Sequence, residues 1–281
     1  KELLSDDQGD EPPLVVVGYD ARYKSQIFAQ DSVRVLAGHG VRSLILPRPL
    51  PTPVLAYTSL SKKAKAGIMV TASHNPAEDS GYKVYWEDGA QIVNPVDLKI
   101  AKRIDYKNPP AKESLADYED AAILKGDDEL IQQYVDFASS CVSPESKREI
   151  NQIYTPLHGV GKEVFLEVFE KAGFKKPALV ESQAEPDPDF PTVVFPNPEE
   201  EGALDLAIEL AVEKNADLII ANDPDADRLA VVVRHENKWR CLNGNEIGVL
   251  LAEHILSKGK GEERLVVTTV VSSGLLSKIA D

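Results

Sequence analysis

The chain has 281 residues, of which 43% are hydrophobic, and its 31 basic and 46 acidic side chains give a formal net charge of −15. This length predicts two domains and part of a third, and the apolar content is enough to bury a sizeable core. The negative charge disfavours binding to nucleic acid or to an anionic membrane surface. Cys141 and Cys241 lie far apart, which excludes a disulfide framework and a zinc site built on clustered cysteines.

Targeting and membrane signals are absent from the sequence pattern. No apolar run approaches the ~18 residues of a membrane-spanning helix. The N-terminal residues lack the basic-then-apolar order of a signal peptide. Since the only methionine is Met69, we expect the chain to begin inside a longer protein or to have been processed. We expect a cytoplasmic location.

In the first half of the chain, short apolar runs alternate with helical periodicity. The predicted strands cover 14–18, 44–46, 66–71 and 82–86. The predicted helices cover 29–40, a segment that begins near Pro53, and 128–140. A polar surface excursion is expected over 104–127, and a linker over 143–147. This alternation predicts a doubly wound α/β layer.

A second alternation begins at Ile150. It predicts strands at 153–155, 178–180, 218–220 and 229–233, with helices at 164–172 and 204–211. A third unit begins near Trp239, with a helix over 246–256, a strand over 265–270 and another helix from Ser272. The fold class is therefore α/β, with tandem doubly wound domains.

The segment Thr71 to Pro76 reads T-A-S-H-N-P and follows a predicted strand. A residue before proline is driven out of the helical region, so the segment is expected to turn tightly at the carboxyl end of the strand, where open α/β sheets bind ligands. Ser73 in this turn is a candidate nucleophile, and His74 can move protons or donate to an anion. The alternative is a turn whose polar side chains only cap backbone groups.

The segment Asn222 to Arg228 places three carboxylates in a short loop between two apolar strands, at Asp223, Asp225 and Asp227. Such a cluster needs a cation, and an all-oxygen ligand set suits Mg²⁺. A calcium-binding EF-hand is excluded, because its required glycine and glutamate are replaced by Arg228 and Arg234. Arg228 suggests a phosphoryl group beside the metal. A solvated acidic turn is the alternative.

In these two segments the chain resembles the α-D-phosphohexomutase superfamily, which includes phosphoglucomutases and phosphomannomutases. Its phosphoserine loop, T-[AG]-S-H-N-P, matches Thr71 to Pro76 at every position, and its metal loop, D-G-D-x-D-R, matches Asp223 to Arg228 except at Pro224. Further matching segments are Gly18 to Arg22 (G-x-D-x-R), Gly81 to Lys83 (G-[FY]-K) and the P-T-P turn within 49–53. Pro224 and the segment 158–161 are similar to the branch that handles glucose and pentose phosphates.

The resemblance implies three-layer α/β domains with mixed sheets. It assigns 1–145 to an active-serine domain that lacks its start, 146–238 to a metal-binding domain and 239–281 to the start of a truncated third domain. The sugar-selecting loop of the third domain and the phosphate loop of a fourth are absent from this sequence. We therefore expect negligible turnover from the isolated chain, and the oligomeric state stays open.

The resemblance also implies roles for the site residues. Ser73 carries a phosphoryl group that passes to a sugar phosphate, giving a sugar 1,6-bisphosphate intermediate and activator. Mg²⁺ is held by the three aspartates together with a phosphoserine oxygen. Lys83 acts as general base or phosphate contact. His74 moves a proton or contacts the phosphoserine, Arg228 contacts the phosphoryl group or holds its loop, and Arg22 supports the active loop.

The function that this implies is interconversion of a sugar 1-phosphate and 6-phosphate, with glucose as the favoured sugar and a phosphosugar as the only expected partner. Phosphopentomutase and phosphomannomutase activities are the alternatives within the family. Outside it, a serine-dependent phosphatase and a catalytically incomplete metal-binding fragment remain open.

Overall fold

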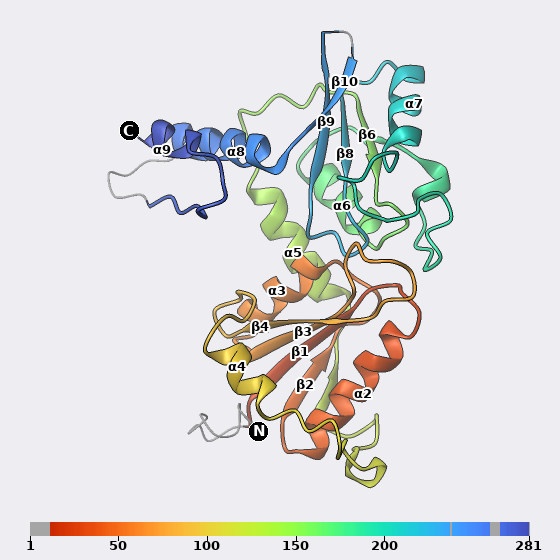
Figure 1. Ribbon diagram of the computed structural model, residues 1–281, viewed down its shortest axis with the longest axis vertical. Coiled ribbons are helices and arrows are strands. Elements are labelled where there is room, and N and C mark those ends of the chain that lie inside the picture. Colours follow the sequence, from red (N-terminus) through yellow and green to blue (C-terminus); the bar gives the residue numbers. More distant parts are fainter. Residues whose placement is uncertain (1–11, 237, 259–264, 281) are drawn as a thin grey trace.

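The structure is a computed structural model that describes residues 12–236, 238–258 and 265–280. Figure 1 shows two α/β units one above the other, with α8 and α9 to the side of the upper unit. No helix among the described residues is long and apolar enough to cross a membrane. The expected α/β class with mixed sheets is confirmed, because each sheet combines parallel and antiparallel strands.

The first unit is built on a sheet of order β4-β3-β1-β2-β5. Its strands are β1 (Leu14–Tyr19), β2 (Arg42–Ile45), β3 (Ala66–Val70), β4 (Tyr82–Trp86) and β5 (Ile123–Lys125). Its helical segments are α2 (Ser25–Gly38), α3 (Thr52–Ser61), α4 (Val96–Ala101), η1 (Lys112–Ser114) and α5 (Asp128–Ser140). β4 runs antiparallel to β3, and the other pairings are parallel.

Both faces of this sheet are buried, as the unbroken apolar run of β1 predicts. Val15 and Val17 pack in one cluster with α2, whereas Val16 packs in the other with α3 and α5. The second cluster continues into the upper unit, because Val164 on α6 (Lys162–Lys171) belongs to it. The two units therefore share one apolar interface.

The second unit is built on a sheet of order β10-β9-β8-β6-β7. Its strands are β6 (Gln152–Thr155), β7 (Ala178–Leu179), β8 (Leu218–Ala221), β9 (Ala230–His235) and β10 (Lys238–Leu242). Besides α6 its helical segments are η2 (Glu181–Gln183) and α7 (Asp205–Glu213). The helices α8 (Gly244–Lys258) and α9 (Leu275–Ala280) follow β10. β8, β9 and β10 are successive antiparallel neighbours.

One expected strand is corrected. The run 265–270 forms no strand, because no described strand pairs with it and its side chains, such as Leu265 and Val270, are exposed. Trp239 to Leu242, which the expected boundary assigns to the third unit, lie in β10, and β10 pairs with β9 of the second sheet. The segment 104–127 also holds β5 and η1, which the sequence pattern did not predict.

Candidate active site

The serine turn lies at the carboxyl end of β3. Ser73 has a positive φ of 54°, a backbone conformation that is uncommon outside glycine and concentrates at functional sites. The Arg22 guanidinium holds the turn, because it donates to the carbonyl oxygens of Ser73 (2.7 Å), Asn75 (2.6 Å) and Pro76 (2.6 Å). Asp20 Oδ2 in turn lies 3.4 Å from Arg22 Nε and forms an ion pair with it. The support expected of Arg22 is thus present in the geometry.

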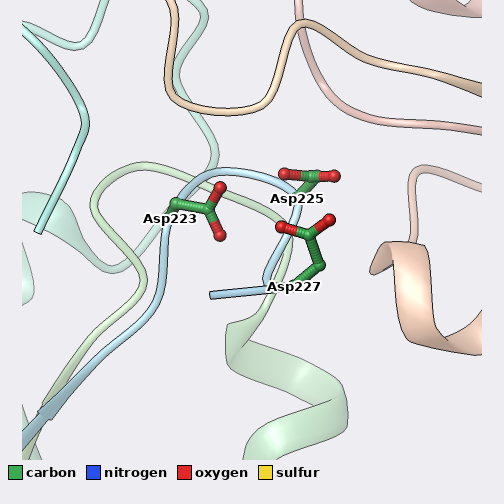
Figure 2. Close-up of side chains that lie close together, drawn as sticks. All are labelled: Asp223, Asp225 and Asp227. Atoms are coloured by element: carbon green, nitrogen blue, oxygen red, sulfur yellow. The ribbon is translucent and has the colours of Figure 1, made fainter. Parts of the chain in front are cut away.

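The acidic loop connects β8 to β9. Asp223 and Asp225 are fully buried, and one carboxylate oxygen from each of the three aspartates lies within 4.8 Å of the others. Figure 2 shows the Asp225 and Asp227 carboxylates side by side, with Asp223 facing them across the loop. Asp225 Oδ1 has no hydrogen-bond partner within the described part of the chain, although it is buried. A buried, unpaired carboxylate oxygen is costly unless a cation binds it, so this donor set fits Mg²⁺.

The fold brings the serine turn and the acidic loop into direct contact. Ser73 Oγ donates to Asp223 Oδ2 at 2.8 Å, although the two residues are 150 positions apart. Lys83, on β4 beside β3, donates to Asp225 Oδ2 at 2.6 Å and to Asp227 Oδ2 at 2.5 Å. Ser73, the Lys83 ammonium and the three aspartates therefore form one cluster between the two units.

The remaining candidates lie at the edge of this cluster. His74 Nδ1 is 3.4 Å from Ser73 Oγ. Arg228 is exposed, and its backbone N–H donates to Asp223 Oδ1 at 3.1 Å, which supports a role in holding the loop. His158 is buried, and its Nε2 lies 2.8 Å from Thr192 Oγ1.

The charges in the cluster set its protonation. Burial raises the pKa of Asp223 to about 7, and the negative charges of Asp225 and Asp227 act in the same direction. Burial opposes ionisation of Asp225 as well, but the Lys83 ammonium outweighs it and the pKa of Asp225 lies below its usual value.

The two basic candidates differ in their protonation. Burial, together with the charges of Arg228 and Lys83, lowers the pKa of His74, so its imidazole is neutral at pH 7. Burial acts to lower the pKa of Lys83, but Asp225 and Asp227 raise it above its usual value. Lys83 is therefore an ammonium in this arrangement, which favours the phosphate contact over the general base among its two expected roles.

Two contacts of the acidic loop were not predicted from the sequence. Thr52, the first residue of α3, donates from its hydroxyl to Asp225 Oδ2 at 2.5 Å and from its N–H to Asp225 O at 2.9 Å. Gly159 packs against Pro224 so closely that a Cβ there would lie 2.3 Å from Pro224 Cα. In the sequence, the P-T-P turn that contains Thr52 could have indicated the first contact, and the glycine that follows His158 could have indicated the second.

Comparisons with known proteins agree with this arrangement. The family models for phosphoglucomutase/phosphomannomutase α/β/α domain I and domain II match residues 3–110 and 132–237. A solved structure from Thermus thermophilus has a TM-score of 0.76 and 26% identity, over 92% of this chain and 55% of that one. A phosphoglucomutase/phosphomannomutase family protein from Burkholderia thailandensis has a TM-score of 0.69 and 24% identity over 92% of this chain and 53% of its own, which supports the fold alone.

Curated relatives carry several mutase names. A Haemophilus influenzae protein named "Probable phosphomannomutase" is 46% identical over 96% of this chain and 56% of its own length. The human glucose 1,6-bisphosphate synthase is 40% identical and the mouse phosphopentomutase 38% identical, each over 94% of this chain and 46% of its own length. This chain thus spans about half the length of these relatives. With both domain models matched over most of its residues, the chain belongs to the phosphoglucomutase/phosphomannomutase family.

Proposed function

We propose that this chain carries the phosphoserine and metal-binding parts of a phosphosugar mutase, with Ser73 as the phosphorylated residue. The observation that carries the proposal is the 2.8 Å contact between Ser73 Oγ and Asp223 Oδ2, which places a hydroxyl nucleophile against a triad of carboxylates. A phosphoryl group on Ser73 would lie where a bound cation can neutralise its oxygens.

Asp223, Asp225 and Asp227 would hold Mg²⁺, together with an oxygen of the Ser73 phosphoryl group. When bound, the metal supplies charge neutralisation for the transferred phosphoryl group. Asp223 and Asp225 are buried and Asp227 is partly exposed, so the site opens on one side. The Lys83 ammonium, which contacts Asp225 and Asp227, would contact a phosphate on that side.

The transfer itself needs one bond formed, one broken and one proton moved. The P–Oγ bond of phosphoserine breaks while a bond forms between phosphorus and a sugar hydroxyl oxygen, whose proton must leave. The neutral His74 imidazole would accept that proton and return it to Oγ; its Nδ1, 3.4 Å from Ser73 Oγ, supports this role. Reversal with the other phosphate of the bisphosphate completes an isomerisation.

We further propose glucose phosphate as the sugar substrate, with pentose and mannose phosphates as alternatives. The names of the relatives span all three classes. A comparison of phosphoryl transfer to Ser73 from the 1,6-bisphosphates of glucose and mannose and from ribose 1,5-bisphosphate would rank the sugars, in a protein that also carries the expected sugar-selecting loop. Equal transfer from all three would contradict a preference for glucose.

The direct test is intact-protein and peptide mass spectrometry after incubation with glucose 1,6-bisphosphate and Mg²⁺, carried out on a protein that also carries the third- and fourth-domain loops expected to hold the substrate. We expect one phosphoryl group on Ser73 and none on the Ser73→Ala chain, with Ser61→Ala as the matched control that still accepts phosphate. Release of inorganic phosphate in excess of glucose 6-phosphate and glucose 1-phosphate would favour a phosphatase. Absence of phosphate from Ser73 under saturating donor would refute the proposal.

A further inference from the structure

The first residue of α3 contacts the acidic loop through two groups at once. Thr52 is buried and donates its hydroxyl to Asp225 Oδ2 at 2.5 Å. Its backbone N–H donates to the Asp225 carbonyl at 2.9 Å. These two hydrogen bonds fix both the backbone and the side chain of one aspartate, and they come from the other unit of the molecule.

The Thr52 hydroxyl binds one carboxylate oxygen of Asp225 and leaves the other available. Oδ2 accepts from both Thr52 and Lys83, whereas Oδ1 has no hydrogen-bond partner among the described residues. Only Oδ1 is then available to a cation without breaking a hydrogen bond. An aspartate held this way would offer Oδ1 to a cation in a fixed orientation.

Thr52 and Lys83 differ in how they act on this carboxylate. The Lys83 ammonium carries a charge that competes with a cation for Asp225 and Asp227. The Thr52 hydroxyl is neutral, so it can orient the carboxylate while the cation is bound. Its backbone is anchored on both sides, because Leu50 and Val54 lie in the apolar cluster that also contains Val164 of the second unit.

We propose that Thr52 is a positioning residue that orients Asp225 for the divalent cation and so ties metal affinity to the docking of the two units. This inference rests on the proposed function, since it takes the three aspartates as the metal ligands. Partners that orient metal ligands typically contribute about 10–100-fold to metal affinity. Removal of the Thr52 hydroxyl should therefore weaken cation binding without removing any ligand.

The test measures Mn²⁺ binding to the 281-residue chain by electron paramagnetic resonance, and Mg²⁺ by competition. Thr52→Val removes the hydroxyl at nearly constant volume, and we expect an apparent Kd about tenfold weaker. Thr52→Ser keeps the donor and should restore binding to near the wild-type value. Thr58→Val is the matched control, because Thr58 lies on the same helix, is equally buried, and its hydroxyl has no partner among the described residues.

The outcomes separate this inference from the proposed function. Failure of the wild-type chain to bind Mn²⁺ would refute the metal assignment and this inference with it. Wild-type binding that Thr52→Val leaves unchanged, or that Thr58→Val weakens equally, would refute the role of Thr52 alone. Thr52→Ala, which adds no bulk, serves if Thr52→Val does not fold. If both variants unfold while Thr52→Ser folds, Thr52 is a structural residue and the inference is overturned.

Discussion

Gly159 packs tightly against Pro224 of the acidic loop. We therefore predict that Gly159→Ala lowers both the stability of the chain and its affinity for Mg²⁺. Gly159 N–H donates to Pro156 O at 2.8 Å, and the next residue, Val160, donates to Pro224 O at 2.9 Å. An added Cβ at position 159 would lie 2.3 Å from Pro224 Cα, 2.5 Å from its O and 2.7 Å from its C. Because these are backbone atoms of the residue between Asp223 and Asp225, the clash can be relieved only if the loop or the turn moves.

The size of the effect follows from these distances. Overpacking a well-packed interior costs typically about 1–3 kcal/mol, and all three contacts here are shorter than real Cβ atoms make, so we expect the upper end, about 3 kcal/mol. Because the two units share one apolar cluster and should unfold together, that corresponds to a fall in Tm of roughly 6–12 °C. Displacement of Pro224 also misplaces two of the three ligands, so Mg²⁺ affinity should fall by on the order of tenfold or more.

Scanning calorimetry with and without Mg²⁺ measures both effects on one sample. Gly248→Ala in α8 is the matched control, because a Cβ there has no atom within 4 Å among the neighbours described and alanine favours a helix. It should leave Tm and the Mg²⁺-induced shift unchanged or slightly raised. A Gly159→Ala chain with wild-type Tm and Mg²⁺ affinity would show that the turn does not constrain the acidic loop.

Four further predictions test the other parts of the site. Mg²⁺ at about 100 times its Kd should stabilise the chain by about 2.7 kcal/mol, and a chelator should reverse this in calorimetry; no shift would contradict a metal site. Lys83→Met should tighten Mg²⁺ binding by on the order of tenfold in titration calorimetry, because a charge that competes for Asp225 is removed; weaker binding would contradict that competition. Arg22→Lys cannot donate in a planar fork to the three carbonyls of the serine turn, so phosphorylation of Ser73 should slow by on the order of 10–100-fold in timed mass spectrometry, and an unchanged rate would refute the support role. Val164→Ala should lower the unfolding free energy by about 2 kcal/mol in urea titration, and a change near zero would show that the shared apolar cluster does not join the units.

The elements that the sequence predicts well are those whose pattern is local. The run Leu14 to Tyr19 is apolar on both faces, and the structure buries it on both. Strand direction was less visible in the pattern. Yet only residues 71–81 separate β3 from β4, fewer than a parallel crossover needs, so the antiparallel pairing is a consequence of chain length.

Short or unpaired runs were predicted poorly for a different reason. β5 has three residues, too few to show any period, and it exists because Ser43 to Ile45 of β2 offer it a parallel partner. The run 265–270 has the composition of a strand, but composition does not supply a hydrogen-bonding partner. A strand forms only when a neighbouring strand pairs with it, so the sequence of one segment predicts a strand only in part.

The site shows the same division between local chemistry and long-range placement. The residue types alone indicate Ser73 and the three aspartates as candidates, because a serine on a tight turn and three clustered carboxylates are each typical of a chemical role. Thr52 has no such signature, and only the docking of α3 against the acidic loop brings its hydroxyl to Asp225.

Lys83 shows why roles are harder to predict than positions. A lysine is a base only when its surroundings favour the neutral amine, and burial alone would do so. Here two carboxylates from the other unit outweigh burial and hold it as an ammonium. The protonation of Lys83 therefore depends on contacts that arise only when β4 and the acidic loop meet.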